Sequence, residues 1–423
     1  MLPTVPLADK HVDEYAVPAG EEAVELLRKA ARPFAGATML HLNSTAYGGG
    51  VAELLQSQLP LLNDLGIQAT WALLEGSDEY YAVTKAVHNA LQGAEVPWTE
   101  EMRGAYWDRI RANAAEFTDG YDYVFVHDPQ PAALLSVLEE EGRRSGRWIW
   151  RCHIDLSTPF RPVWEFFEPI VNRYDAAIFT MEDFAQPGVT GPTLAFIPPS
   201  IDPCSTKNLE LADETIADVL QTYRIDPDRP IVVQVSRFDP WKDPLGVIDA
   251  FRLARKEFPG LQLILAGSMA HDDPEGMRFL DLTEEHRAGD PDIHLLTNVH
   301  NVGNLEINAF QRASTVVVQK SIREGFGLVV AEAMAAGRPV VAFAGGGALE
   351  TVVPPGGDEL PTGVLFEAQT VEALVDAMRR LESGTIAFDP KALRARAEDF
   401  DRPRFKERIA SFLATCLGEP AAC

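Results

Sequence analysis

The order of apolar segments is the feature that most constrains how this chain folds. Short apolar runs of strand length alternate with segments of helical periodicity along nearly all of the 423 residues. In the first half, the predicted strands are residues 37–43, 68–76, 121–128, 147–155 and 175–183. In the second half, they are residues 230–238, 261–268, 293–298, 314–321, 339–345 and 362–367. Alternation of this kind builds βαβ units, so it predicts parallel sheets covered by helices on both faces.

A proline-rich segment separates the two series. Residues 196–208 contain Pro198, Pro199 and Pro203, which neither a helix interior nor a central strand tolerates. We interpret this segment as an interdomain linker. The sequence therefore predicts an α/β protein of two doubly wound domains, residues 1–200 and 201–400, and an amphipathic helix over residues 401–418.

Composition limits the classes of binding partner and the cellular compartment that we expect for this chain. Asp and Glu total 63 against 37 Lys and Arg, and the net charge of −26 repels nucleic acid and anionic membranes. The four cysteines stand outside CxxC spacing, so we expect no zinc site and a reducing cytosol. We also expect no signal peptide and no membrane span, since neither a basic-then-apolar start nor a run of about 18 apolar residues is present.

Ligands of open parallel sheets bind beyond the carboxyl ends of the strands. In the first domain, NSTAYGGGVAE (43–53) places three successive glycines between a predicted strand and a predicted helix. Glycine lets backbone N–H groups approach a ligand closely, and a helix start favours an anion such as phosphate. A plain tight turn is the alternative. His127-Asp128 and His153 to Asp155 stand at the ends of two further predicted strands. A lone His at a strand end is often structural, whereas two such groups in one sheet favour a functional role.

Two cations follow the first strand of the second domain. They are Arg237 and Lys242, in VSRFDPWKD (235–243). Cations at a strand end can clamp a diphosphate and stabilise a leaving group. The alternative is a pair of surface cations whose exposed contacts contribute little.

Two glutamates flank a glycine-containing turn in EGFGLVVAE (324–332). Glu324 precedes the turn, and Glu332 lies about one turn into a helix that Gly337 is expected to end. A solvated helix face is one reading of Glu332. Because its neighbours are almost wholly apolar, Glu332 is expected to need a partner, and a ribose diol is one candidate.

These segments, together with VHDP, CHID and the proline-rich linker, resemble the retaining GT-B glycosyltransferases of the large GT4 family. The resemblance covers essentially the whole chain and implies a GT-B fold, in which two Rossmann-like domains face a cleft and a C-terminal helix returns to the first domain. HLNSTAYGGGVAELL and RCHIDLS are similar to a narrower family, the trehalose glycosyltransferring synthases and their phosphorylase relatives. That similarity implies retaining transfer of glucose from UDP-, ADP- or GDP-glucose to free glucose, which gives α,α-trehalose. A trehalose phosphorylase or another GT4 sugar transferase is the alternative, and the compact length fits the synthase better.

The resemblance also implies roles for individual residues. Glu332 would bind the donor ribose and Glu324 the donor sugar, while Arg237 and Lys242 would stabilise the departing diphosphate. The implied donor site further comprises Gly49, Gly50, Asn298, Gly325, Phe326, Gly327, Leu328 and Val329. The implied acceptor site comprises Asn43, Tyr47, Asp128, His153 and Asp155. The implied catalytic residues are Asp128, His153, Arg237, Lys242 and Glu324.

We expect a cytoplasmic enzyme with no tightly bound cofactor and no metal ligands, whose co-substrate is a nucleoside-diphosphate glucose. Its expected partners are this donor, glucose and trehalose; stimulation by Mg²⁺ and a homodimer stay open. A sugar-nucleotide-binding regulatory protein is the non-enzyme alternative, which the presence of both cations and both glutamates disfavours. A nicotinamide-dependent dehydrogenase is weaker still, because no G-x-G-x-x-G opens either domain. The segment 344–363, with its glycines and prolines, is longer than in many relatives, so its contacts stay open.

Overall fold

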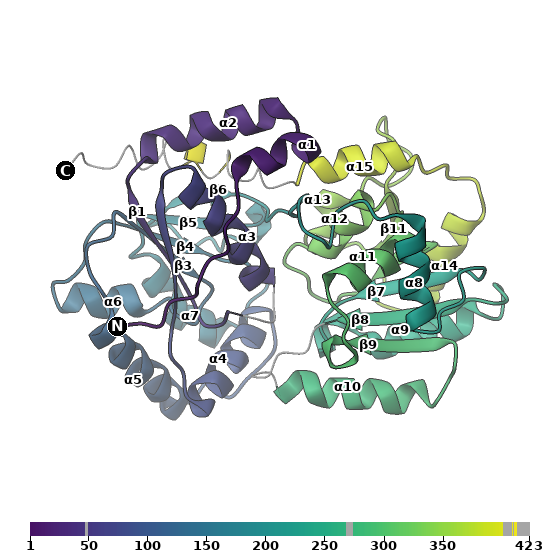
Figure 1. Cartoon of the computed structure of the whole chain (residues 1–423). Coiled ribbons are helices and arrows are strands. Elements are labelled where there is room, and N and C mark those ends of the chain that lie inside the picture. The colour runs from purple at the N-terminus through teal and green to yellow at the C-terminus, as the bar shows by residue number, and fades with distance from the viewer. Residues whose placement is uncertain (47–49, 268–273, 401–407, 409, 413–423) are drawn as a thin grey trace. The chain divides into compact units, whose positions relative to one another are not determined.

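The computed structural model describes residues 1–46, 50–267, 274–400, 408 and 410–412. It contains two compact units (Figure 1). The first is built from residues 1–200 and the described residues from 408 onwards, and the second from residues 201–400.

The first unit contains a six-stranded parallel sheet in the order β2-β1-β3-β4-β5-β6. Its strands are β1 (Thr38–Asn43), β2 (Gln68–Leu73), β3 (Tyr123–His127), β4 (Arg147–Arg151), β5 (Ala176–Phe179) and β6 (Thr193–Phe196). Its helices are α1 (Ala16–Ala19), α2 (Glu21–Ala31), α3 (Gly50–Asp64), α4 (Asp78–Leu91), α5 (Glu100–Glu116), α6 (Leu134–Glu140) and α7 (Arg161–Val171). The chain runs from β1 out to β2 and then returns to β3 on the other side of β1. The switch point of this sheet therefore lies between β1 and β3.

The second unit repeats the plan, with the sheet order β12-β11-β10-β7-β8-β9 and all pairs parallel. Its strands are β7 (Ile231–Val235), β8 (Gln262–Gly267), β9 (Ile293–Thr297), β10 (Val316–Gln319), β11 (Val340–Phe343) and β12 (Gly363–Phe366). Its helices are α8 (Asp213–Thr222), α9 (Pro244–Ala254), α10 (Pro274–Arg287), α11 (Asn304–Ala313), α12 (Leu328–Ala335), α13 (Ala348–Thr351), α14 (Val371–Glu382) and α15 (Pro390–Glu398). The switch point here lies between β7 and β10.

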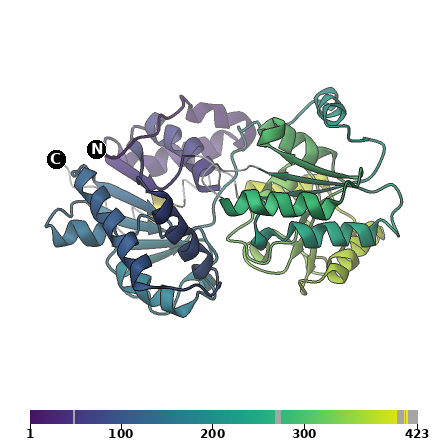
Figure 2. The same ribbon diagram turned by 90° about the horizontal axis from the view of Figure 1, so that it is seen from below.

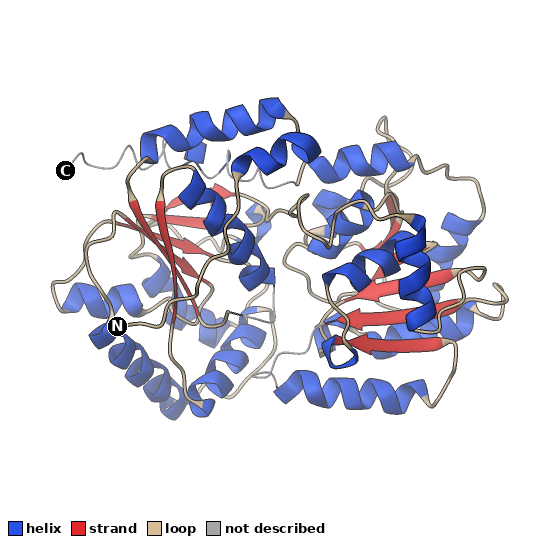
Figure 3. Cartoon of the chain, in the orientation of Figure 1, coloured by secondary structure: helices blue, strands red, loops and turns tan. Residues whose placement is uncertain are grey.

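Helices cover both faces of each sheet (Figures 1, 2 and 3). Because successive side chains of a strand point to opposite faces, each sheet is the centre of two cores. In the first unit, Leu40 and Leu42 pack into the core beneath α4 to α7, whereas Met39 packs into the core beneath α2 and α3. In the second unit, Val233 belongs to the core beneath α8, α11 and α12, and its neighbour Val232 to the core beneath α9 and α14.

The predicted α/β class with two doubly wound parallel sheets is confirmed. Every strand predicted in the second half forms, and α12 ends two residues before Gly337, as expected. β6 was not predicted, because it has four residues and runs directly into the proline-rich segment. Most of the predicted helix 401–418 lies outside the described residues. Its described part is helical, and Ala410 and Phe412 pack against the core of the first unit.

Candidate functional site

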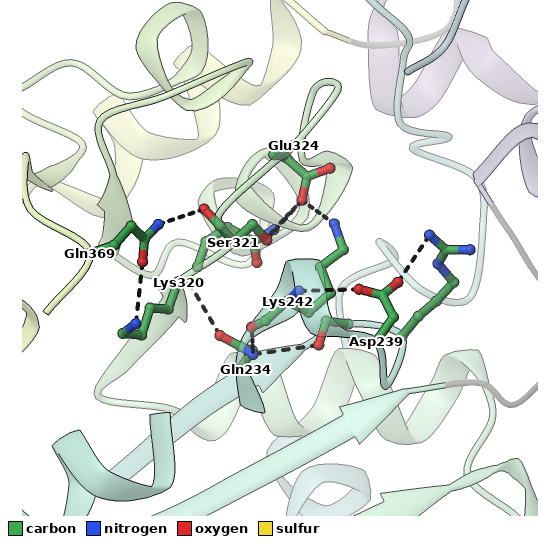
Figure 4. A network of polar contacts seen from close by, with 10 residues as sticks. Gln234, Asp239, Lys242, Lys320, Ser321, Glu324 and Gln369 are labelled. Carbon is green, nitrogen blue, oxygen red and sulfur yellow. Dashed lines mark hydrogen bonds and ion pairs between the residues drawn. The ribbon is translucent and has the colours of Figure 1, made fainter. Parts of the chain in front are cut away.

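In the second unit, the switch point brings Lys242 and Glu324 together. Lys242 ends the short 3-10 helix η4 (Pro240–Lys242) after β7, and Glu324 follows β10. The Lys242 Nζ donates to Glu324 Oε2 at 2.6 Å, and both side chains are largely buried, with exposed fractions of 14% and 16% (Figure 4). Lys242 is therefore a buried partner of a carboxylate rather than one of two loosely held surface cations.

Glu324 is held in its ionised form. Burial alone would raise the pKa of its carboxyl group, but the charge and hydrogen bond of Lys242, with hydrogen bonds from Ser321 and Gln319, lower the pKa below its ordinary value. The Ser321 hydroxyl lies 3.2 Å from Glu324 Oε2. At neutral pH this carboxylate accepts hydrogen bonds and donates none, which suits it to the hydroxyl groups of a sugar.

Asp239 organises the two cations, and the sequence analysis missed it. Its side chain is fully buried, and its Oδ1 accepts from the backbone N–H of Lys242 at 3.1 Å, as the N-cap of η4. Its other oxygen lies 3.1 Å from Arg237 Nη2, while Arg237 itself is 39% exposed. The signal was present in the sequence, since an Asp directly before a Pro is a common start for a helical turn.

The loop between Glu324 and α12 depends on close backbone packing. Gly327 precedes α12 with a φ of +80°, a left-handed conformation that favours glycine. A Cβ added at Gly346 would lie 2.0 Å from the carbonyl oxygen of Glu324, and one at Gly347 would lie 2.1 Å from that of Phe326. The glycines after β11 therefore pack directly against the backbone of the 324–327 loop, where a larger residue would not fit. Within segment 344–363, Gly346 and Gly347 are the residues that pack against this loop.

Glu332 is buried in α12, with an exposed fraction of 4%, so it is not on a solvated helix face. The partner that its apolar surroundings require is in part a protein group, because Lys207 Nζ lies 3.0 Å from its Oε1. Lys207 comes from the proline-rich segment, which the sequence analysis read as a linker. No periodic pattern indicates this pair, since 125 positions separate the two residues in the chain.

In the first unit, predicted residues gather at the carboxyl ends of three adjacent strands. Asn43 ends β1, Asp128 follows β3, and His153 follows β4. The backbone N–H of His153 donates to Asp128 Oδ1 at 2.8 Å, which joins the second and third of these positions. Asn43 is fixed by its own contacts, because its Oδ1 accepts from Trp71 Nε1 at 2.8 Å. Asp155 is buried and accepts from the backbone N–H of Ser157 at 2.9 Å, so it shapes the loop after β4.

Asp128 is in an unusual state. Its φ is +63°, which is uncommon for a residue other than glycine, and strained residues of this kind concentrate at functional sites. Burial raises the pKa of its carboxyl group to about 7, although the hydrogen bond from His153 N–H and the charge of Arg151 act in the opposite direction. A carboxyl group that titrates near neutral pH is typical of catalytic and binding sites.

Behind His153 lies a chain of imidazoles that the sequence analysis did not identify. His153 Nε2 lies 2.9 Å from His127 Nδ1, and His127 Nε2 lies 3.0 Å from His41 Nδ1. Burial, with the charges of Arg151 and His127, lowers the pKa of His153 well below its ordinary value, so its ring is neutral at pH 7. A pocket of about 40 Å³ lies beside this chain, lined mostly by apolar side chains. It has room for about three water molecules.

The remaining predicted residues fall outside these two clusters. Tyr47 and Gly49 lie outside the described residues, and Gly50 is the first residue of α3. Asn298 is exposed at the start of the short helix η5 (Asn298–His300). Within the described ranges, no group of three His, Cys, Asp or Glu side chains is placed to hold a metal ion. No helix in the described part of the chain is both long and apolar enough to span a bilayer.

Comparison with solved structures defines the class. An E. coli structure described as trehalose-6-phosphate bound with UDP-2-fluoro glucose is 16% identical, covers 90% of this chain and 99% of its own, and has a TM-score of 0.72. An α,α-trehalose-phosphate synthase (UDP-forming) from Burkholderia xenovorans, in complex with glucose-6-phosphate, is 14% identical, covers 90% and 100%, and has a TM-score of 0.69. The protein thus has the GT-B fold. Residues 41–186 match the family "Trehalose synthase, N-terminal domain", and residues 217–399 match "Glycosyl transferases group 1".

Sequence relatives define the family. The trehalose synthase of Rubrobacter xylanophilus is 46% identical over 84% of this chain and 86% of its own length. That of Pyrococcus horikoshii is 47% identical over 80% and 81%. A trehalose phosphorylase of Pleurotus pulmonarius is 26% identical over 79% of this chain but 52% of its own length. The chain belongs to the trehalose synthase family and is a trehalose-forming glycosyltransferase.

Proposed function

We propose that this enzyme transfers glucose from a nucleoside-diphosphate glucose to free glucose, with retention of configuration, to give α,α-trehalose. The observation that carries the proposal is the buried pair of Lys242 and Glu324 at the switch point of the second sheet. It offers a cation for a diphosphate and an ionised carboxylate for sugar hydroxyls within 2.6 Å of each other. A nucleotide sugar presents those two kinds of group side by side.

In the proposed mechanism, electrostatic stabilisation of the leaving group is the main contribution. Lys242 and Arg237 face the diphosphate, whose negative charge grows as the bond to glucose breaks. The incoming hydroxyl attacks on the same face, and an oxygen of the leaving phosphate takes its proton. Backbone N–H groups of Gly325 to Val329, at the start of α12, bind the sugar and phosphate groups.

The ribose of the donor is assigned to Glu332. The pair with Lys207 keeps this buried carboxylate charged, so that it can accept hydrogen bonds from a diol. Asn298, exposed after β9, is the proposed contact toward the base.

The acceptor glucose is assigned to the first unit, where Asp128 and His153 follow the adjacent strands β3 and β4. A neutral imidazole and a carboxyl group that titrates near pH 7 can each donate or accept, which matches the hydroxyl groups of an uncharged sugar. Asn43 and Asp155 shape the loops around them.

A donor-by-acceptor panel tests the proposal. The purified protein is incubated with UDP-, ADP- or GDP-glucose, or with glucose 1-phosphate, as donor and with glucose or glucose 6-phosphate as acceptor. Products are identified by chromatography and anomeric NMR. We expect α,α-trehalose from free glucose in the absence of phosphate. Trehalose formed from glucose 1-phosphate and glucose, with release of phosphate, would instead establish a phosphorylase. Binding of nucleotide sugar without any product would favour the regulatory protein. Arms with EDTA and with added Mg²⁺ measure stimulation by metal, and size-exclusion chromatography measures assembly.

A further inference from the structure

A second lysine is buried behind the Lys242–Glu324 pair. Lys320 directly follows β10, and its side chain has an exposed fraction of 3%. Its ammonium group makes an ion pair with the Asp243 carboxylate. It also donates to Gln369 Oε1 at 3.2 Å (Figure 4). A charge this deeply buried is costly unless its partners are in place, so the arrangement depends on all three side chains.

Asp243, the partner of Lys320, is also the neighbour of Lys242 in the chain. Its backbone is left-handed, with a φ of 45°, and its Oδ1 accepts from the backbone N–H of Gly246 at 3.1 Å as the N-cap of α9. For a residue other than glycine, this conformation is strained and persists where surrounding contacts impose it. The ion pair with Lys320 is such a contact, and it lies at the residue directly after Lys242.

Two glutamines add a second connection between the same loops. Gln234 accepts from the backbone N–H of Lys320 at 3.3 Å and donates to the carbonyl oxygen of Lys242 at 3.0 Å. Gln369 donates to the carbonyl oxygen of Ser321 at 2.9 Å while it accepts from Lys320. Lys320 is thus joined by its side chain and by its backbone to the segment that carries Lys242, and its neighbour Ser321 is joined to Glu324.

We propose that Lys320 is a positioning residue, whose buried ammonium group holds Asp243 in its left-handed conformation and so aims the adjacent Lys242 at Glu324 and at the donor diphosphate. This inference rests on the proposed function, in which Lys242 faces the diphosphate. Lys320 acts through Lys242 because its own Nζ is enclosed by Asp243 and Gln369. The loop after β10 therefore supplies Glu324 to the site and also orients the cation that Glu324 binds.

The test is a double-mutant cycle in the full-length protein. Lys320→Met removes the charge and keeps the length of the side chain, whereas Asp243→Asn keeps a capping oxygen and tolerates the left-handed backbone. We expect Lys320→Met to lower kcat by tens of fold, within the roughly hundredfold cost that a misplacement of about 1 Å can carry. KM for glucose should change by less than about threefold, and affinity for UDP and ADP, measured by calorimetry, should fall with kcat. Because Lys320→Met leaves Asp243 charged, the double variant Lys320→Met/Asp243→Asn serves as a second, charge-balanced form if the single variant folds poorly.

The cycle separates positioning from other roles. If Lys320 acts through Asp243, the double variant loses no more activity than the more damaged single variant, and Lys320→Arg recovers part of the loss by restoring the charge. Losses that multiply in the double variant, or a kcat for Lys320→Met within twofold of wild type, would overturn the inference. A rise in KM for glucose equal to the fall in kcat would also overturn it. The exposed Lys256→Met, in the same unit, controls for the loss of one lysine.

One further variant distinguishes this inference from the proposed function. Lys242→Ala with wild-type turnover would refute the diphosphate role of Lys242, and the inference would fail with it. Lys242→Ala with a large loss of turnover, beside an unaffected Lys320→Met, would refute the inference and leave the proposed function standing.

Discussion

The two units have similar sheets, but the polar side chains near the carboxyl ends of their strands differ in charge state. In the second unit, ionised side chains are held in pairs, namely Lys242–Glu324, Arg237–Asp239, Lys320–Asp243 and Lys207–Glu332. In the first unit, burial favours the neutral forms of His153 and Asp128, whose pKa values are lowered and raised respectively. One scaffold therefore holds ion pairs in one copy, whereas in the other copy burial opposes the charged forms of Asp128 and His153 beside the buried guanidinium of Arg151. The first suits an anionic diphosphate, and the second suits an uncharged sugar.

The largest expected effect comes from removing the central cation. Lys242→Ala should lower turnover by about 10²- to 10³-fold, the usual cost of one donor that faces developing charge. KM for glucose should change little, because glucose carries no charge for Lys242 to offset. Steady-state kinetics with each nucleotide sugar measures this, and Lys256→Ala, at an exposed site of the same unit, is the matched control. Near-normal turnover would show that Lys242 does not stabilise the diphosphate, and the ion pairs of the second unit would then have no demonstrated link to the donor.

Sequence reasoning predicted the fold far better than the contacts. Apolar strand segments are fixed by local pattern, so eleven of the strands in the two sheets were predicted, and the four-residue β6 was missed. Lys242 and Glu324 were both named because each comes just after a predicted strand, where ligands of parallel sheets bind, although 82 positions separate them.

The partners of these residues were not predictable in the same way. Lys207, Asp239 and Lys320 follow no periodic pattern, and each becomes significant through a buried pair whose other member is distant or lies in an irregular turn. The histidine chain has the same origin, since His41, His127 and His153 come from three strands that the sheet brings side by side. Which side chains meet across a sheet depends on the order of the strands, which no local pattern specifies.

The next expected effect tests the acceptor role that we assign to Asp128 in the first unit. Asp128→Ala should leave the affinity for UDP and ADP unchanged while trehalose synthesis falls by roughly hundredfold, since an acceptor hydroxyl that is slightly misplaced reacts poorly. Titration by calorimetry and chromatography of the product are performed on the same preparation. The exposed Asp108→Ala, on α5 of the same unit, is the control. Weakened nucleotide binding would contradict the assignment of this unit to the acceptor.

A smaller effect is expected from Glu332. Glu332→Gln should weaken binding of UDP and ADP by about 1.5 to 3 kcal/mol, the usual loss for hydrogen bonds to a charged group. Because Lys207 then lacks its buried partner, the melting temperature should also fall, and Glu332→Gln/Lys207→Met should recover stability without recovering affinity. Recovery of both in the double variant would show that Glu332 serves the fold alone.

The smallest expected effect is on the pH dependence of folding stability, measured for the wild type and for the variant Asp128→Asn, whose side chain has the same shape and no charge. The pKa of this carboxyl group is about 7 in the folded protein and about 3.9 in an unfolded chain. The folded state therefore binds more protons between these values. The stability that this proton contributes is fully present below about pH 4 and is lost as the pH rises through about 7. Between pH 5 and 6, the free energy of unfolding of the wild type should fall by up to about 1.4 kcal/mol relative to that of Asp128→Asn. The Asn variant has no carboxyl proton to lose and should keep the left-handed backbone. Urea denaturation at pH 5, 6, 7 and 8 measures the difference, with Asp108→Asn as a surface control. A constant difference across this range would show that Asp128 is ionised throughout, and the neutral character assigned to the first unit would then rest on His153 alone.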